Sequence, residues 1–189
     1  MIKSATRYIF IATLSVFLLP VYTLATEVEG KTFSKLVKVE NTSLKLVGTG
    51  LLRYFGFKAY VGALYIEEGN NVDALFADTA KRIEIEYMRS IKGSDFGPAT
   101  IKSLKKNIDE ETYNRLSDRI EYHNSLYEDV QPGDRYALTY VPGKGTELTL
   151  NGKPKGVIRG ADFAAAIFTI WVGPRPISES FKEQILGLS

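Results

Sequence analysis

The chain has 189 residues, with 24 Lys and Arg against 22 Asp and Glu, one histidine and no cysteine. This length and charge balance indicate one globular domain and argue against a nucleic-acid surface, which needs a clustered positive field. The lack of cysteine excludes disulfides, lipid attachment and Cys nucleophiles. Together with the single histidine it removes most metal sites, so we expect neither a metal nor a cofactor.

Residues 1–25 have the three-part pattern of a secretory signal peptide. Lys3 and Arg7 form a basic start, an apolar run follows, and the segment ends at the small residue Ala25. The apolar run, from Tyr8 to Tyr22, has 15 residues, fewer than the roughly 20 that span a bilayer. Cleavage after Ala25 would leave residues 26–189 with zero formal charge and no stable membrane span. We therefore expect a periplasmic or otherwise secreted bacterial protein; an uncleaved N-terminal anchor is the alternative.

The first half of the remaining chain reads mainly as strands. Residues 26–35 are assigned to a leader of undefined order, and residues 36–40 form a candidate strand. Dense apolar residues predict two long strands, at 44–57 and 59–67, joined around Gly56. One helical turn is expected at 71–76. In residues 81–88, apolar positions alternate with charged ones, a pattern typical of a half-buried strand.

The second half alternates helices and strands. A helix capped by Ser94 or Asp95 is expected to run to Asn107, and a second helix follows Asp109. Strands at 136–141, 146–150 and 154–158 form a meander, with Asn151-Gly152 as a tight turn. The chain closes with an apolar helix at 161–172 and a short helix at 179–186. The order of the elements predicts an α+β domain, in which an antiparallel sheet carries its helices on one face.

Three segments together resemble the chalcone isomerase-like family, especially its exported bacterial members. They are LVGTGLLRYFGFKAYVGALYIEEG (46–69), VQPGDRYALTYVPGKGTELTLNGKPKGVIRG (130–160) and DFAAAIFTIWVGPRPISESFKEQILG (162–187). The match is specific because their order and spacing agree as well as their residues. The resemblance implies a chalcone isomerase-like open-faced sandwich, with a curved antiparallel sheet, a helical layer and a ligand cleft between them. It covers residues 26–189 as a single domain.

Arg53 is the leading candidate for a ligand-binding residue. It lies in an otherwise apolar run, so its guanidinium must either reach solvent or meet an anion, because burying it unpaired is very costly. The residues alone leave both options open. The resemblance implies that Arg53 corresponds to a family arginine that faces an anionic group of the ligand.

The other candidates also come from the resemblance. Tyr60 occupies the place of the catalytic threonine of true chalcone isomerases, and Phe96 the place of their catalytic tyrosine. Ile170, with Thr169 beside it, falls at a polar position of the family. We expect these four residues to line the ligand site and none to be catalytic, although core packing explains Tyr60 equally well. The single histidine, His123, has no nucleophile partner and is expected to be a packed or surface residue.

These features favour a non-catalytic protein that binds a small apolar or amphipathic molecule with an acidic group, such as a fatty acid. The alternative is an intramolecular lyase that closes a ring by attack of a phenolate on an enone. That reaction needs a cation for the nucleophile and a hydrogen-bond donor for the developing enolate. Arg53 would supply the first, but Phe96 cannot supply the second. A structural or partner-binding role in the envelope is a third possibility.

Overall fold

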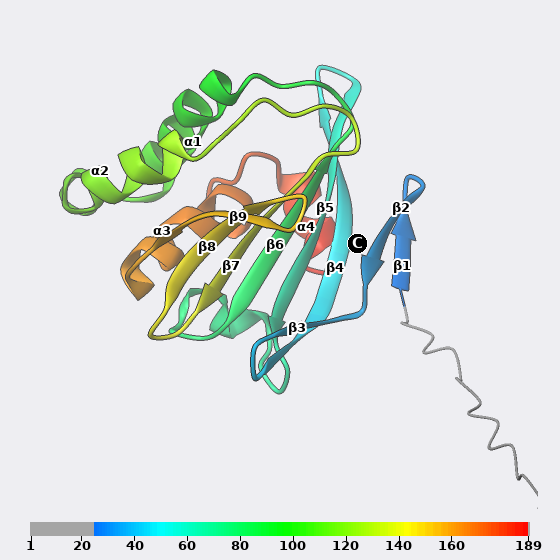
Figure 1. Ribbon diagram of the computed structural model, residues 1–189, viewed down its shortest axis with the longest axis horizontal. Coiled ribbons are helices and arrows are strands. Elements are labelled where there is room, and N and C mark those ends of the chain that lie inside the picture. Colours follow the sequence, from blue (N-terminus) through cyan, green and yellow to red (C-terminus); the bar gives the residue numbers. More distant parts are fainter. Residues whose placement is uncertain (1–24, 189) are drawn as a thin grey trace, which may run out of the picture.

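The computed structural model describes residues 25–188. The predicted signal peptide lies outside these residues except for Ala25. The main sheet has seven antiparallel strands, each beside its neighbour in sequence, as Figure 1 shows. The strands are β3 (Leu36–Val39), β4 (Thr42–Tyr54), β5 (Phe57–Glu67), β6 (Lys81–Tyr87), β7 (Arg135–Val141), β8 (Gly145–Leu150) and β9 (Lys153–Ile158).

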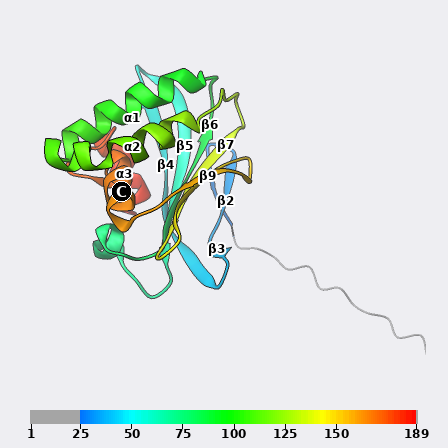
Figure 2. The ribbon, with the colours of Figure 1, turned by 60° about the vertical axis from the view of Figure 1, so that its left-hand side comes forward.

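The helices cover one face of this sheet, which Figure 2 shows nearly edge-on. They are α1 (Gly93–Asn107), α2 (Glu110–Ser125), α3 (Ala161–Val172), α4 (Glu179–Ile185) and the short 3₁₀ helix η1 (Val72–Phe76). Buried apolar side chains from β5 to β8 and from the four α-helices form one continuous core. The predicted α+β fold, a curved antiparallel sheet with helices on one face, is confirmed.

Local sequence accounts for most of the turns and caps. Asn151 and Gly152 take φ values of +51° and +76°, which a two-residue hairpin turn requires. Asp109 caps α2 by accepting a hydrogen bond from the Thr112 amide at 2.7 Å. The predicted cap of α1 was wrong. That helix starts at Gly93, whose amide donates to Asp129 Oδ1 at 2.7 Å, so the acceptor comes from a distant segment.

The segment assigned to an undefined leader is instead an ordered hairpin. Strand β1 (Ala25–Val28) pairs with β2 (Lys31–Ser34), and the pair forms a separate two-stranded sheet. Phe33 of β2 is fully buried against the main sheet on the face opposite the helices. Each strand of this hairpin has only four residues, and an isolated two-stranded hairpin is marginally stable at best, so it depends on apolar contacts with the folded sheet.

The hairpin also changes the surroundings of β6, which was expected to be half-buried. Glu84 and Glu86 are only 6% and 8% exposed, although they point away from the helices. Arg135 Nη1 donates to Glu84 at 3.0 Å, and Arg135 Nε donates to Glu86 at 3.1 Å. Lys31 of the hairpin contacts Glu86 at 2.7 Å, and Arg82 donates to Glu84 at 2.8 Å.

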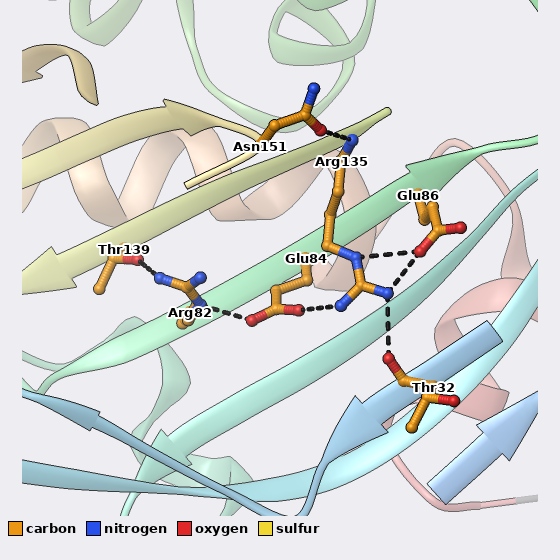
Figure 3. Close-up of polar contacts among 7 residues, drawn as sticks. All are labelled: Thr32, Arg82, Glu84, Glu86, Arg135, Thr139 and Asn151. Atoms are coloured by element: carbon orange, nitrogen blue, oxygen red, sulfur yellow. Dashed lines mark hydrogen bonds and ion pairs between the residues drawn. The ribbon is translucent and has the colours of Figure 1, made fainter. Parts of the chain in front are cut away.

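We call these five residues, Lys31, Arg82, Glu84, Glu86 and Arg135, the outer-face network. Figure 3 shows its members other than Lys31. Arg135 also donates to the carbonyl of Thr32 at 3.0 Å and lies over the Phe33 ring at 4.4 Å. Burial pushes the pKa of Glu86 upward, but hydrogen bonds from Lys31 and Arg135 outweigh it and leave that pKa below its ordinary value. The network therefore fastens the hairpin to the sheet through paired charges.

Candidate functional site

Aromatic side chains fill the space between the sheet and the helices near the start of β5 and the end of β6. We call them the aromatic cluster: Tyr60, Tyr87, Phe96, Tyr127, Tyr136 and Phe181. The Tyr60 ring lies 5.3 Å from Phe181 and 5.9 Å from Tyr87, with edges directed at faces. Tyr87 in turn lies 5.7 Å from Phe96. These centroid separations are those of rings in contact, so side chains fill the space between the sheet and the helices here.

The structure brings Phe96 into this cluster from α1. Its ring stacks on Tyr127 at 4.5 Å with an interplanar angle of 10°. His123 of α2 lies beside Tyr127 at 5.1 Å and is fully buried. Burial lowers the pKa of His123 to about 4, against a smaller opposing effect of its contact with Asn124. The histidine is therefore a neutral packing residue at pH 7, which agrees with its predicted role.

Tyr60 carries an unusual buried hydroxyl. Its Oη is closed off from solvent and makes no hydrogen bond of good geometry within residues 25–188. The Trp171 indole is close enough to interact with it, but an indole can only donate, so the hydroxyl hydrogen still has no acceptor. Burial raises the pKa of Tyr60 well above its ordinary value, and the interaction with the Trp171 side chain opposes this rise by less. A buried hydroxyl without a partner is destabilising, so this atom is a ready donor for a polar group that enters the cleft.

Thr169 and Ile170 lie on α3. Ile170 is buried in the core, and its backbone carbonyl accepts from the Ile177 amide at 2.8 Å. The Thr169 hydroxyl donates back to the Ala166 carbonyl at 2.6 Å. Its hydrogen is therefore already used within the helix, and Thr169 is a weaker candidate for ligand contact than Tyr60.

Arg53 lies at the exposed end of β4, apart from the cleft interior. It lines a surface hollow of about 270 Å³, the edge hollow, together with Leu51, Ser178, Ser180 and Gln184. Within residues 25–188, no carboxylate pairs with Arg53. Arg53 therefore reaches solvent, one of the two options that the sequence left open, and its guanidinium remains available to an incoming anion.

Helix α4 separates the edge hollow from the aromatic cluster. Ser180 and Gln184 face the hollow, whereas Phe181 reaches Tyr60. The helix lies very close to β4 and β5 because glycines face it: a Cβ on Gly62 would come within 2.7 Å of the Phe181 ring. Gln184 also accepts a hydrogen bond from the Leu51 amide at 2.9 Å, on the edge of β4. The predicted site residues thus form two groups, on the two sides of one short helix.

The structure adds residues that sequence reasoning missed. Tyr87, Tyr136 and Phe181 pack in the same buried cluster as Tyr60 and Phe96. Lys81 is fully buried near the other end of the inner face, where Nζ donates to the Ala77 carbonyl at 2.7 Å and lies 5.1 Å from the Tyr140 ring centroid. Burial lowers the pKa of Lys81 to about 8. Lys81, Ile83 and Ile85 are every second residue of β6 and therefore face the same side of the sheet. This spacing was the sequence signal for an inward-facing lysine.

This arrangement suits binding better than acid–base catalysis. The phenols of the aromatic cluster are neutral, His123 beside the cluster is neutral and packed, and Phe96 offers no donor. Within residues 25–188, no group of three His, Asp or Glu side chains could hold a metal ion. In the same part of the chain, no helix is both long and apolar enough to cross a membrane.

The fold defines a class of α+β proteins with one curved antiparallel sheet and a helical layer. Residues 25–187 match the chalcone isomerase-like family, and the chain belongs to that family. A fatty-acid binding protein from Arabidopsis thaliana has a similar structure, with a TM-score of 0.67 and 15% sequence identity over 86% of this chain and 96% of that one. No curated protein matches the sequence. At this identity the similarity establishes a shared fold.

Proposed function

We propose that this protein binds a small, mainly apolar molecule with an acidic group, of the fatty-acid type, without transforming it. Family membership and the fatty-acid binding protein with the same fold support this proposal. The observation that carries it is the position of two polar groups on either side of α4, next to a closely packed apolar cluster. Arg53 lies outside α4 without a carboxylate partner among the described residues, and the unpartnered Tyr60 hydroxyl lies inside.

In this arrangement the carboxylate binds Arg53 in the edge hollow, and the alkyl chain passes between β4 and α4 into the aromatic cluster. Because the rings are already in contact, the chain has to displace Phe181, and α4 has to move with it. Few polar contacts hold this helix: Gln184 accepts from the Leu51 amide, and Lys182 donates to the Gly173 carbonyl at 2.9 Å. Ligand binding is therefore expected to break the Gln184 contact.

The test uses Trp171, the chain's single tryptophan, which lies beside Tyr60. Its fluorescence is titrated with dodecanoate and with dodecanol. A charge-assisted hydrogen bond contributes about 1.5–3 kcal/mol, or roughly 10- to 200-fold in affinity. Arg53→Ala should weaken dodecanoate binding by about that factor and leave dodecanol nearly unchanged. Arg53→Lys should recover part of the loss, because an ammonium group cannot form the two-pronged contact.

Two matched variants locate the charge that is recognised. Arg159→Ala removes an exposed cation at the opposite end of the sheet and should change neither affinity. Lys81→Met removes the buried cation of the inner face. A selective loss of dodecanoate in Lys81→Met, with none in Arg53→Ala, would contradict the assignment of Arg53. Failure of the wild type to bind either ligand would contradict the proposed function itself.

Absence of catalysis is tested separately with a hydroxychalcone. Each missing transition-state donor costs about 10²–10³ in rate, so cyclisation should not exceed the spontaneous rate. Fast turnover that disappears in Arg53→Ala would establish the lyase alternative.

We further infer that the protein acts outside the cytoplasm of a bacterium, after cleavage near Ala25. The basic start, the 15-residue apolar run and the small residue at position 25 support this inference. N-terminal sequencing of the exported protein should begin at Thr26, the second residue of β1. An intact N-terminus in the membrane fraction would favour an uncleaved anchor.

A further inference from the structure

The turn between β4 and β5 exposes three large aromatic side chains. Tyr54, Phe55 and Phe57, here named the aromatic tip, are 65%, 84% and 60% exposed. The rings of Tyr54 and Phe55 lie 4.5 Å apart. The turn forms the upper end of this hairpin in Figures 1 and 2. Single exposed apolar residues need no explanation, but three that adjoin on one turn indicate an interaction site.

The backbone of this turn makes the choice of phenylalanine more unusual. Phe55 and Gly56 take φ values of +48° and +80°, nearly those of Asn151 and Gly152 in the β8–β9 turn. Asparagine is favoured at the first of these positions, whereas a bulky residue at positive φ is strained. The chain thus accepts both solvent exposure and backbone strain at Phe55. Strain of this kind concentrates at functional positions.

Basic side chains surround the aromatic tip. Arg53 and Lys58 flank it in sequence, and the Arg89 guanidinium lies over the Phe57 ring at 4.5 Å from its centroid. Glu29 of the β1–β2 turn forms an ion pair with Lys58. Within residues 25–188, neither Arg53 nor Arg89 has a carboxylate partner. The tip therefore carries a local positive charge beside its apolar rings.

We propose that the aromatic tip binds the surface of an anionic lipid bilayer. Aromatic rings favour the headgroup level of a membrane, and basic side chains beside them are attracted to anionic lipids. A bilayer also accommodates a narrow, convex tip without a complementary pocket. A folded protein partner would need about 800 Å² on each side, more surface than one two-residue turn offers. This proposal is independent of the fatty-acid proposal, because it requires no ligand in the cleft.

The experiment measures co-sedimentation of the mature protein, residues 26–189, with vesicles of phosphatidylcholine alone or with added phosphatidylglycerol. The wild type should bind the anionic vesicles more tightly, and salt should weaken that binding. Phe55→Asn should reduce binding about tenfold, the low end of the effect of burying one such side chain. Arg89→Gln should reduce binding about fivefold on anionic vesicles and little on neutral ones.

Phe55→Asn also distinguishes a lost contact from a lost fold. Asparagine fits the turn, so this variant should melt about 2–4 °C higher than the wild type while it binds vesicles less. Val157→Thr, which changes a 46% exposed apolar residue on β9, should leave binding unchanged. Equal vesicle binding by the wild type and Phe55→Asn would overturn the proposal. So would self-association without vesicles that Phe55→Asn abolishes, because the tip would then contact a second copy of the chain.

Discussion

The helix-covered face of the sheet and the opposite face are both buried, but by different interactions. On the helix-covered face, the aromatic cluster packs through ring contacts of 4.5–6.2 Å, and the Tyr60 hydroxyl is left without a partner. On the opposite face, the outer-face network pairs each of its carboxylates with two basic side chains. Figure 3 shows Arg135 between Glu84 and Glu86, with Arg82 on the other side of Glu84.

This difference bears on function. Each ring pair contributes only about 0.5–1.5 kcal/mol beyond the area it buries, so we expect moving one ring to cost less than separating buried charges. A partly buried ionic network has fixed geometry, and separating its members leaves charges without partners. We therefore expect the outer-face network to hold the sheet in place. Any rearrangement of side chains should occur in the aromatic cluster, under the helices. The predictions that follow test this division, from the largest expected effect to the smallest.

Arg135→Met should give the largest loss of stability. It leaves Glu84 with Arg82, and Glu86 with Lys31, as the remaining cationic partner. Each hydrogen bond to a charged group that is lost costs about 1.5–3 kcal/mol, and Arg135 makes several. Urea denaturation of the wild type and the variant measures the loss. Adding Glu86→Gln to the variant should recover part of it, since one of the stranded charges is then removed. A loss below about 1 kcal/mol would mean that the network does not fasten the outer face.

His123 should make the helical side sensitive to acid. Its pKa lies at about 4 in the folded protein and near 6.5 in the unfolded chain. The unfolded state therefore takes up a proton first, and stability falls as the pH drops from 6.5 towards 4, by up to about 3 kcal/mol in all. His123→Gln should lack this share of the pH dependence. Because the chain has a single histidine, NMR observes it directly, and titration near pH 6.5 would contradict its burial as a neutral ring.

Tyr60→Phe should have the smallest effect and a favourable sign. It removes a buried hydroxyl that has no partner, so the variant should be as stable as the wild type or about 1 kcal/mol more stable. Tyr136→Phe is the matched control, because the Tyr136 hydroxyl accepts from the Glu128 amide at 2.8 Å. That variant should lose about 1 kcal/mol. Equal losses in the two variants would show that Tyr60 has a partner in solution.

Site prediction was less complete than fold prediction. The sequence identified Tyr60 and Phe96, and the structure brings both into one cluster. It gave no sign that Arg53 lies across a helix from them. That separation depends on how closely α4 approaches β4 and β5, where Gly50 and Gly62 remove the side chains that would hold it away. Close approach of distant segments leaves no periodic pattern in a sequence.

The sequence by itself determined the fold class, most strand and helix boundaries and the Asn151-Gly152 turn. These features depend on hydrophobic periodicity and on backbone preferences, which act over a few residues. The tertiary structure alone decided that residues 25–34 form a hairpin and that Glu84 and Glu86 are buried. It also decided that Asp129 accepts a hydrogen bond from the first amide of α1. Each of these outcomes needs a partner far along the chain, and the free energy that fixes it exists only once the sheet has brought the two together.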